Sequence, residues 1–286
     1  MSVVASARPA VETRVSRGLW SDAASRLVRN RPAIVGLVCI AIFVGGALLA
    51  SVIAPYGPIE RTAGGVNRPP SAEHLFGTDL QTRDVLSRVL YGAQISLLVG
   101  VVSVFMALAM GGLVGALAGG FGGRVDSVLM RTTDVLLAIP GILLAIGIIA
   151  WLDRGMIQLM LAIAVSYAPV FARLLRGSLL ALRESDYVIA ARSIGASERR
   201  LLLRHMLPNA LTPLIVQATL VLATAIIDIA GLGFLGLGPP DPRTPEWGTM
   251  LVDARRFLQQ APHLVFFPGA AIVVNLIGLA AVWYVG

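Results

Sequence analysis

The stretch LLALRESDYVIAARSIGASERRLLLRHMLPN, residues 179–209, lies between two long apolar runs and decides how the rest of the chain is interpreted. With Arg176 just before it, the stretch brings six arginines together. Burying six arginines in lipid costs ~15–20 kcal/mol, at roughly 2.5 to 3.5 kcal/mol each, which is more than the leucines return. We therefore expect this stretch to protrude into water from a membrane protein.

Within this stretch the pattern predicts two short helices separated by a sharp turn. Gly195 supplies the backbone freedom that the turn needs. Ser197 is expected to cap the second helix, with Glu198 at its positive end. Pro208 then begins the next apolar helix, where a missing N–H does no harm. The stretch is therefore predicted to form a helix–turn–helix projection on one side of a membrane.

The composition places the whole chain in the membrane class. Of 286 residues, 56% are hydrophobic and 14% are charged, and the mean hydropathy is +0.80. Soluble domains are about 25% charged. All 23 basic residues are arginine, so a P-loop, which requires lysine, is excluded and ATP hydrolysis would need a partner protein. The net charge of +7 reflects membrane topology and not a nucleic-acid partner, and the single Cys39 cannot form an internal disulfide.

Hydrophobic runs predict an all-α integral membrane protein with six transmembrane helices. We expect residues 1–32 to form a cytoplasmic segment with an amphipathic helix, and residues 33–286 to form the membrane domain. The expected spans are residues 33–54, 95–118, 135–151, 156–175, 210–229 and 263–284. The loop of residues 176–208 lies on the cytoplasmic side, and residues 55–94 and 231–262 lie outside. The proposed inner segments (residues 1–32, 119–134 and 173–207) then carry 15 arginines and the outer ones (55–92, 152–155 and 231–262) carry 8, so both termini are expected in the cytoplasm.

Details of the spans lead to four local predictions. Gly111, Gly115 and Gly119 repeat every four residues, which favours close packing of two helices. Pro140 is expected near the middle of the third span. At the start of that span Arg131 and Asp134 are three residues apart and are expected to pair. In the first outer segment, Asp79 is expected to cap a helix.

The projection resembles the coupling loop of permease subunits in bacterial ABC importers, whose pattern is Glu-Ala-Ala, three residues, Gly, nine residues, Ile-x-Leu-Pro. Ile189 stands in place of the Glu and His205 in place of the Ile. The version YVxAARxxGAxxxRxxxRHxLPN of the dipeptide and oligopeptide permease family is matched over residues 187–209. The resemblance implies that the loop docks on a cytoplasmic ATPase through Tyr187, Ala190, Ala191, Arg192, Gly195, Ala196, Arg200, His205, Leu207 and Pro208.

Two further stretches resemble the same family. Residues 74–97 are similar to HxFGTDxxGRDxxSRxxxGxRxSL, with Thr82 in place of Gly and Gln94 in place of Arg. Residues 225–251 are similar to AIxxEAxLSFLGLGxxPPxPxWGxML, with Asp228 in place of the Glu. Asp228 lies inside an apolar stretch, where it is interpreted either as a capped or paired acid or as a contact for the translocated cargo. With Asn275 it is our candidate for the translocation path.

The resemblance implies a type I ABC importer fold and a non-catalytic membrane subunit for di- or oligopeptides in the bacterial cytoplasmic membrane. The implied partners are a second related permease, one or two P-loop ATPases that hold ATP and Mg, and an extracytoplasmic substrate-binding protein. Membrane lipid surrounds the chain, and no cofactor is expected on it. Relatives in the same family carry nickel, glutathione or haem, so these cargoes stay open. A secondary transporter is the alternative from another class, but only Asp228 supplies an ionisable residue within a span and no internal repeat is visible.

Overall fold

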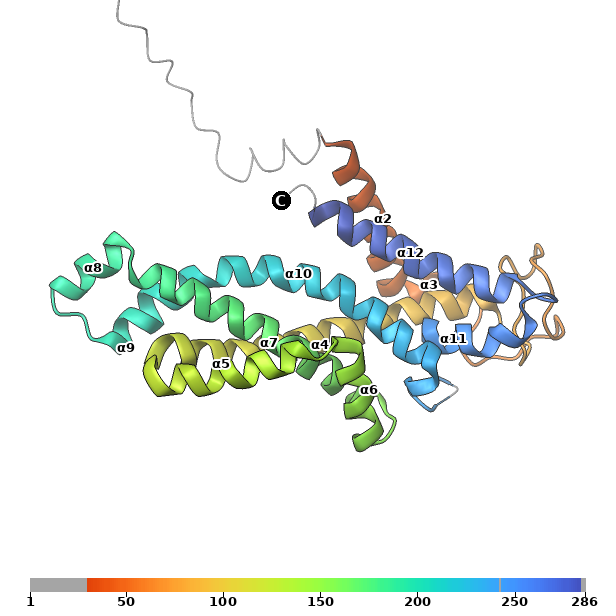
Figure 1. Ribbon diagram of the computed structural model, residues 1–286. Coiled ribbons are helices and arrows are strands. Elements are labelled where there is room, and N and C mark those ends of the chain that lie inside the picture. The colour runs from red at the N-terminus through yellow and green to blue at the C-terminus, as the bar shows by residue number, and fades with distance from the viewer. Residues whose placement is uncertain (1–29, 242, 284–286) are drawn as a thin grey trace, which may run out of the picture.

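The structure is a computed structural model that describes residues 30–241 and 243–283 (Figure 1). The amphipathic helix expected within residues 1–32 therefore lies outside the described residues. The described elements are α2 (Arg31–Leu48), α3 (Ala50–Ile53), α4 (Val85–Phe121), α5 (Gly123–Ala138), α6 (Gly141–Leu152), α7 (Met156–Arg183), α8 (Asp186–Ser193), α9 (Glu198–Arg200), the π-helical turn η1 (Leu201–Met206), α10 (Leu207–Leu232), the π-helical turn η2 (Gly233–Leu237), α11 (Trp247–Ala254), the 3-10 turn η3 (Arg255–Phe257) and α12 (His263–Trp283).

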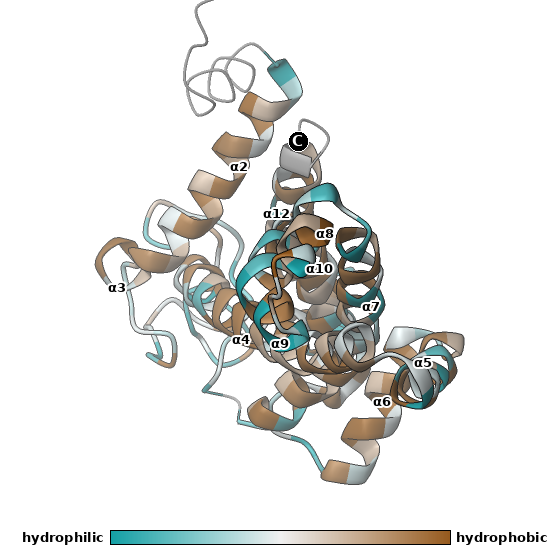
Figure 2. Cartoon of the chain, turned by 90° about the vertical axis from the view of Figure 1, so that its left-hand side faces the viewer, coloured by the Kyte–Doolittle hydropathy of each residue, from teal (hydrophilic) through white to brown (hydrophobic). Residues whose placement is uncertain are grey.

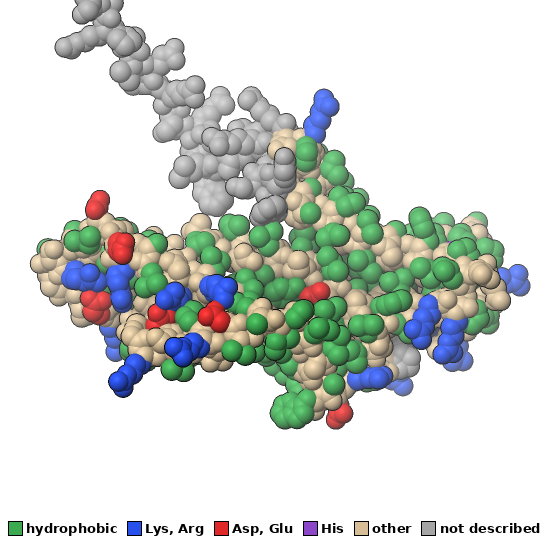
Figure 3. Space-filling view, in the orientation of Figure 1, with side chains coloured by type: hydrophobic (Ala, Val, Ile, Leu, Met, Phe, Trp, Pro, Cys, Tyr) green, Lys and Arg blue, Asp and Glu red, His purple; other side chains and the backbone are tan. Residues whose placement is uncertain are grey.

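Among the described residues, five helices are long and apolar enough to cross a membrane, and a sixth span is reached if α5 and α6 count as one bent pair. Apart from an isolated bridge between Thr78 and Asp84, the described residues contain no β-structure. On the face shown in Figure 3, charged side chains gather at the end that carries α8 and α9 and at the opposite end, and hydrophobic side chains cover the middle. The prediction of an all-α membrane protein is confirmed.

The helix α4 has 37 residues and begins ten residues before the position expected from hydropathy. Its start is fixed by Asp84, whose Oδ2 accepts hydrogen bonds from the Ser87 N–H at 2.8 Å and from the Ser87 hydroxyl at 2.7 Å. The prediction that Asp79 caps this helix is therefore wrong. Asp79 stabilises the turn before it instead, since its carboxylate accepts from the N–H groups of Gln81 and Arg83.

The single helix expected over residues 135–151 is broken into α5 and α6, which meet at an angle of 96°. Proline restricts the residue before it to extended backbone, and Ile139 has φ −92° and ψ 128°. Pro140 also has no N–H with which to continue the helix. The prediction that Pro140 lies within a continuous span is therefore wrong, because the proline ends one helix and precedes the next.

The helix α7 continues to Arg183, so the first eight residues of the predicted loop 176–208 are helical. This extension places arginines of α7 beside acids of α5. Arg176 forms two hydrogen bonds with Asp126, at 2.6 and 2.7 Å, and Arg173 contacts Asp134 at 2.5 Å. The partner of Asp134 is therefore Arg173 and not Arg131, because the α7 arginine reaches it from a neighbouring helix.

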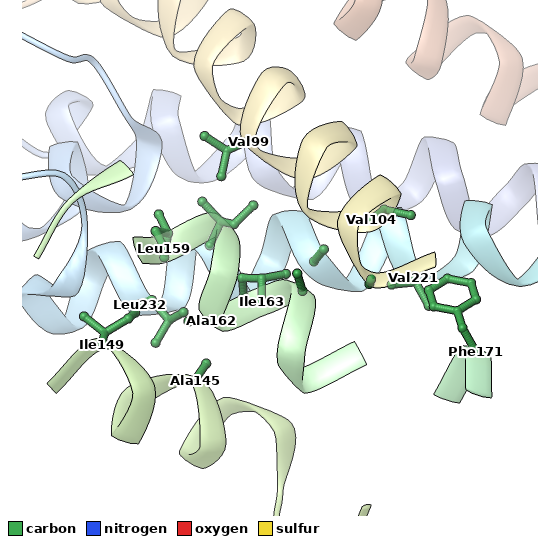
Figure 4. Packing of buried hydrophobic residues seen from close by; sticks show 14 residues of the cluster. Val99, Val104, Ala145, Ile149, Leu159, Ala162, Ile163, Phe171, Val221 and Leu232 are labelled. Carbon is green, nitrogen blue, oxygen red and sulfur yellow. The ribbon is translucent and has the colours of Figure 1, made fainter. Parts of the chain in front are cut away.

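The core lies where α4, α6, α7 and α10 meet (Figure 4). Here α4 and α7 approach so closely that side chains would not fit between them. A Cβ at Gly111 would lie 2.1 Å from the Ala168 carbonyl oxygen, and one at Gly115 would lie 2.5 Å from that of Ala172. The predicted close packing along this glycine row is confirmed. The end of α2 and the start of α12 pack against α4, α10 and α11 in a second apolar cluster, and in Figure 1 the other ends of α2 and α12 extend away from the bundle.

Candidate functional site

The helix–turn–helix predicted from the sequence is present and extends beyond the ends of α7 and α10 (Figure 1). We call residues 184–206 the Gly195 projection. The helix α8 follows the end of α7 after a two-residue turn, and α9 continues through η1 into α10. Figure 2 views this end of the molecule, where polar and apolar segments alternate along α8 and α9. The projection is therefore a direct extension of two long helices and not a separate loop.

The turn at the tip of the projection depends on Gly195. Its φ is +88°, a backbone conformation that other residues adopt only with strain. The Ala196 N–H donates to the Ala191 carbonyl at 3.1 Å, and the Gly195 N–H donates to the Arg192 carbonyl at 3.0 Å. These two bonds are those of a Schellman motif, in which a glycine ends the helix. Ser197 then caps the next helix by accepting from the Arg200 N–H at 3.4 Å, as predicted.

Buried apolar side chains attach the projection to the helices that carry it. Val188 of α8 and Leu201 are both fully buried, and Met206 is 1% exposed. They pack in one cluster with Leu179 of α7 and Leu214 of α10. Since a buried side chain of this size contributes about 1.5–3 kcal/mol, the cluster holds α8 in a fixed position relative to α7 and α10.

Polar contacts add two further connections within the projection. Across the turn, Arg192 Nε lies 3.0 Å from Glu198 Oε1 in an exposed ion pair. The Tyr187 hydroxyl donates to the His205 carbonyl at 3.4 Å, and Asn209 Nδ2 donates to the same carbonyl at 2.5 Å. Tyr187 and His205 are thus brought together, although the bond to His205 uses its backbone.

The outer surface of the projection is apolar at its tip. Ile194 is 88% exposed, and Ile189 and Tyr187 are 49% and 42% exposed. Sequence reasoning missed Ile194, although its position immediately before the helix-ending glycine indicates that it lies at the tip. The predicted residues Ala190, Arg192, Gly195, Arg200 and Pro208 are also exposed, whereas Ala191, Ala196, His205 and Leu207 are partly buried. An exposed apolar tip on a rigid support is suited to docking against another protein.

Pro208 does not begin a new helix, because the chain is helical from Glu198 to Leu237. The proline has no N–H to donate to the carbonyl four residues earlier, and its ring would clash with that carbonyl. The turn before it widens, and the Leu207 N–H donates to Leu202, five residues back. The π-helical turn η1 thus accommodates Pro208 without breaking the connection between the projection and α10.

Asp228, the first candidate for the translocation path, is hydrogen-bonded to a residue of the neighbouring helix α7. Its Oδ2 accepts a hydrogen bond from the hydroxyl of Tyr167 in α7 at 2.7 Å. This geometry favours the interpretation as a paired acid, and a contact with cargo stays a prediction. Asn275 in α12 is 2% exposed, and its Oδ1 has no hydrogen-bond partner among the described residues.

At the opposite end, the outer segment is fastened to the first turns of α4. His74 Nδ1 lies 3.0 Å from Asp84 Oδ1, and Arg88 Nη1 donates to the Pro58 carbonyl at 3.2 Å. Trp247 of α11 donates from its indole N–H to the Val89 carbonyl at 3.0 Å. His74, Arg88 and Trp247 match positions of the family pattern, and these contacts show that each of them has a structural role.

Glu246 begins α11 and is 1% exposed, with its carboxylate accepting from the N–H groups of Gly248 and Thr249. Burial raises the pKa of Glu246 to about 7, although the two backbone N–H groups lower it. A carboxyl group that changes charge near neutral pH is therefore buried at the end of the molecule opposite the Gly195 projection (Figure 1).

Comparison with known proteins gives matches over most of the chain. The model of the binding-protein-dependent transport system inner membrane component matches residues 111–285, and that of the N-terminal membrane domain of oligopeptide transport permease C matches residues 18–70. The chain is 43% identical over 259 residues to the dipeptide transport system permease protein DppC of Alkalihalophilus pseudofirmus, which covers 91% of this chain and 85% of the relative. It is 42% identical over 275 residues to the glutathione transport system permease protein GsiD of Escherichia coli O157:H7, covering 96% and 90%.

Among solved structures, the chain is similar to a chain of the MetNI methionine ABC transporter in its inward-facing conformation. The TM-score is 0.56 at 23% identity, with 69% of this chain and 94% of that chain covered. At this identity the likeness concerns the fold alone, which is that of a type I importer membrane subunit.

Proposed function

Because this chain belongs to the family of binding-protein-dependent transport system inner membrane components, and within it to the dipeptide and oligopeptide permeases, we propose that it moves di- or oligopeptides into the cytoplasm as one membrane subunit of an ATP-driven importer. Its relatives with dipeptide permease names support this cargo. The relative named as a glutathione permease keeps that cargo as the second candidate. Nickel and haem are further alternatives from the sequence.

The observation that carries the proposal is the Gly195 projection. It presents Ile194 and Ile189 at the tip of a support whose underside is buried against α7 and α10. A contact at this tip would therefore displace two long helices together and not only bend a loop. That is the mechanical property that an ATPase needs in order to reorient a membrane domain.

We assign the partners and the orientation on the same basis. The tip docks on one or two P-loop ATPases, which hold ATP and Mg, and this chain takes part in no bond chemistry and holds no cofactor. A second related permease completes the membrane domain, and a substrate-binding protein delivers cargo to the outer end. The excess of arginine at the end with the projection supports a cytoplasmic location for that end and for both termini.

The test is co-purification of the tagged full chain from its own membranes in gentle detergent, followed by mass spectrometry of the accompanying proteins. The expected result is a P-loop ATPase, a second permease and an exported binding protein. The variant Ile194→Asp should lose the ATPase alone, by at least tenfold, because an exposed apolar anchor at an interface contributes about 2 kcal/mol or more. Ile157→Ala is the matched control, since Ile157 is 68% exposed but belongs to the opposite end of α7.

Two results would contradict the proposal. Retention of the ATPase by Ile194→Asp at the wild-type level would remove the projection as the docking site. Recovery of the chain alone, with cargo uptake driven by an ion gradient, would favour the secondary-transporter alternative. The ligand carried by the binding protein would then distinguish peptide from glutathione, nickel or haem.

A further inference from the structure

A long apolar groove lies between α4 and the segment formed by α9, η1 and the start of α10. Its volume is about 740 Å³. Figure 2 looks at this end of the molecule, where α4, α9 and α10 lie next to one another. The floor is formed by small residues of α4, namely Ala109, Gly112, Ala116 and Gly120, and leucines such as Leu203 and Leu211 form the opposite wall. The groove is therefore an open cavity that is lined mainly by apolar side chains.

The groove is long enough to hold an acyl chain that extends through one leaflet of a bilayer. Its α4 wall extends from Leu108 to Phe121, which at 1.5 Å per residue is about 20 Å. One leaflet of the hydrocarbon core is about 15 Å thick. A Cβ at Gly112 would meet nothing within 4 Å, whereas one at Gly120 would lie 2.7 Å from Leu202 Cδ2. The groove is therefore open along its middle and narrows toward the end with the projection.

The charge at that narrow end is positive. Arg199 and Glu198 line the groove there, but the Glu198 carboxylate is already paired with Arg192. Arg199 is exposed and forms no ion pair among the described residues, and neither do Arg200 and Arg204, which follow it on the same segment. A guanidinium group binds phosphate oxygens with two parallel hydrogen bonds and keeps its charge at any physiological pH.

We propose that this groove is a binding site for an anionic phospholipid, with an acyl chain along α4 and the phosphate at Arg199. The apolar walls and the small-residue floor accept the chain, and the unpaired arginines favour a headgroup with net negative charge over a zwitterionic one. The bound lipid would rest against both α4 and the root of the Gly195 projection. The inference requires only that the chain lies in a membrane and does not depend on the cargo.

The test uses the full chain purified from its own membranes with the subunits that accompany it. After delipidation the sample is titrated with phosphatidylglycerol or with phosphatidylcholine of the same acyl chains, and bound lipid is counted by native mass spectrometry. Gly112→Leu fills the open middle of the groove and should weaken phosphatidylglycerol binding at least about tenfold. Arg199→Gln should weaken it about fivefold, which is the effect of one basic residue near an anionic surface.

Two matched controls separate these effects from general ones. Gly147→Leu also places a leucine where nothing lies within 4 Å, but in α6, and Arg124→Gln removes an exposed arginine at the same end of the molecule outside the groove. Both should bind lipid like the wild type. Gel filtration of each variant establishes that it is folded, and Arg199→Gln, a surface change, keeps the test valid if Gly112→Leu is unstable.

Three results would overturn the proposal. If phosphatidylcholine bound as well as phosphatidylglycerol, the arginines would have no role in lipid recognition. If Gly112→Leu bound phosphatidylglycerol like the wild type, the lipid would bind outside this groove. A cysteine at this position, Gly112→Cys in a Cys39→Ser background, should react with a membrane-soluble maleimide in native membranes. Its crosslinking to a second permease subunit would instead show that protein covers the groove.

Discussion

Replacement of Gly195 tests whether the geometry of the projection matters for transport. The change to compare is Gly195→Ala with Gly195→Val, because both add a Cβ at a residue with φ +88°. Nothing lies within 4 Å of the position that this Cβ would take. The energetic effect is therefore backbone strain without a steric clash against neighbouring atoms.

The strain has an expected size. An alanine in left-handed backbone costs about 1–2 kcal/mol, and a β-branched valine costs more because it is a genuine outlier there. Opening the turn to relieve the strain would break the Schellman bonds of Gly195 and Ala196, each contributing about 1 kcal/mol. A cost of 2 kcal/mol changes the ratio of closed to open turn about 30-fold, since every 1.4 kcal/mol is a factor of ten.

The assay has a local and a functional readout. Hydrogen exchange of the Ala196 amide should accelerate about 10-fold in Gly195→Ala and more in Gly195→Val, and ATP-driven uptake in vesicles should fall in the same order. Gly147→Val is the control, because Gly147 also has open space around it but lies within α6. Unchanged exchange in Gly195→Val would refute the strain argument, and fast exchange with wild-type uptake would refute the coupling role.

Three further predictions concern other parts of the chain. Asp84→Ala should lower the stability of the purified protein by about 2 kcal/mol through loss of the cap on Ser87, whereas Asp84→Asn should retain most of it, as thermal unfolding would show. For Glu246 the folded-state pKa of about 7 exceeds the unfolded value of 4.5, so its contribution to stability is present below pH 4.5 and is lost as pH rises through 7. The loss amounts to about 3 kcal/mol of unfolding free energy. In Glu246→Gln this pH dependence of the melting temperature should disappear between pH 5 and 8. The same pH dependence in the variant and the wild type would contradict the pKa of Glu246. Asp228→Asn keeps an acceptor for the Tyr167 hydroxyl and should leave both stability and the KM of uptake close to wild type, so a raised KM would establish contact with cargo.

The sequence predicted the helices that hydropathy alone determines and the projection that its arginines force into water. Both the turn at Gly195 and the cap at Ser197 were predictable because they depend on residues a few positions apart. The first residue of α4 was not predictable from the sequence. Hydropathy indicates where the apolar part of a helix begins, whereas the helix itself begins where its backbone hydrogen bonds begin. Asp79 and Asp84 both stand near a helix start, and only the contacts of His74 and Ser87 identify which one caps it.

Errors elsewhere came from interactions between helices. The partner of Asp134 lies on α7, 39 residues away, and a pairing rule for one helix cannot find it. Membrane helices can contain a proline, so Pro140 was expected within one continuous helix. The helix instead breaks at Pro140, and α6 packs against α7 in the core. Of the predicted site, the exposed positions of the projection follow from the local pattern, whereas the exposure of Ile194 depends on how α8 is anchored by Val188.

The length of α4 has a consequence for motion. At 1.5 Å per residue its 37 residues span about 55 Å, nearly twice the ~30 Å of the hydrocarbon core, so one uninterrupted helix is long enough to extend past the core on both sides. One end carries the outer segment fastened at Asp84 and the other lies against η1 at Gly120. Pivoting such a rod by about 10° around its midpoint moves each end by ~5 Å in opposite directions. A small rotation applied on one side of the membrane thus becomes a displacement of more than a water diameter on the other, with no intermediate joint to absorb it.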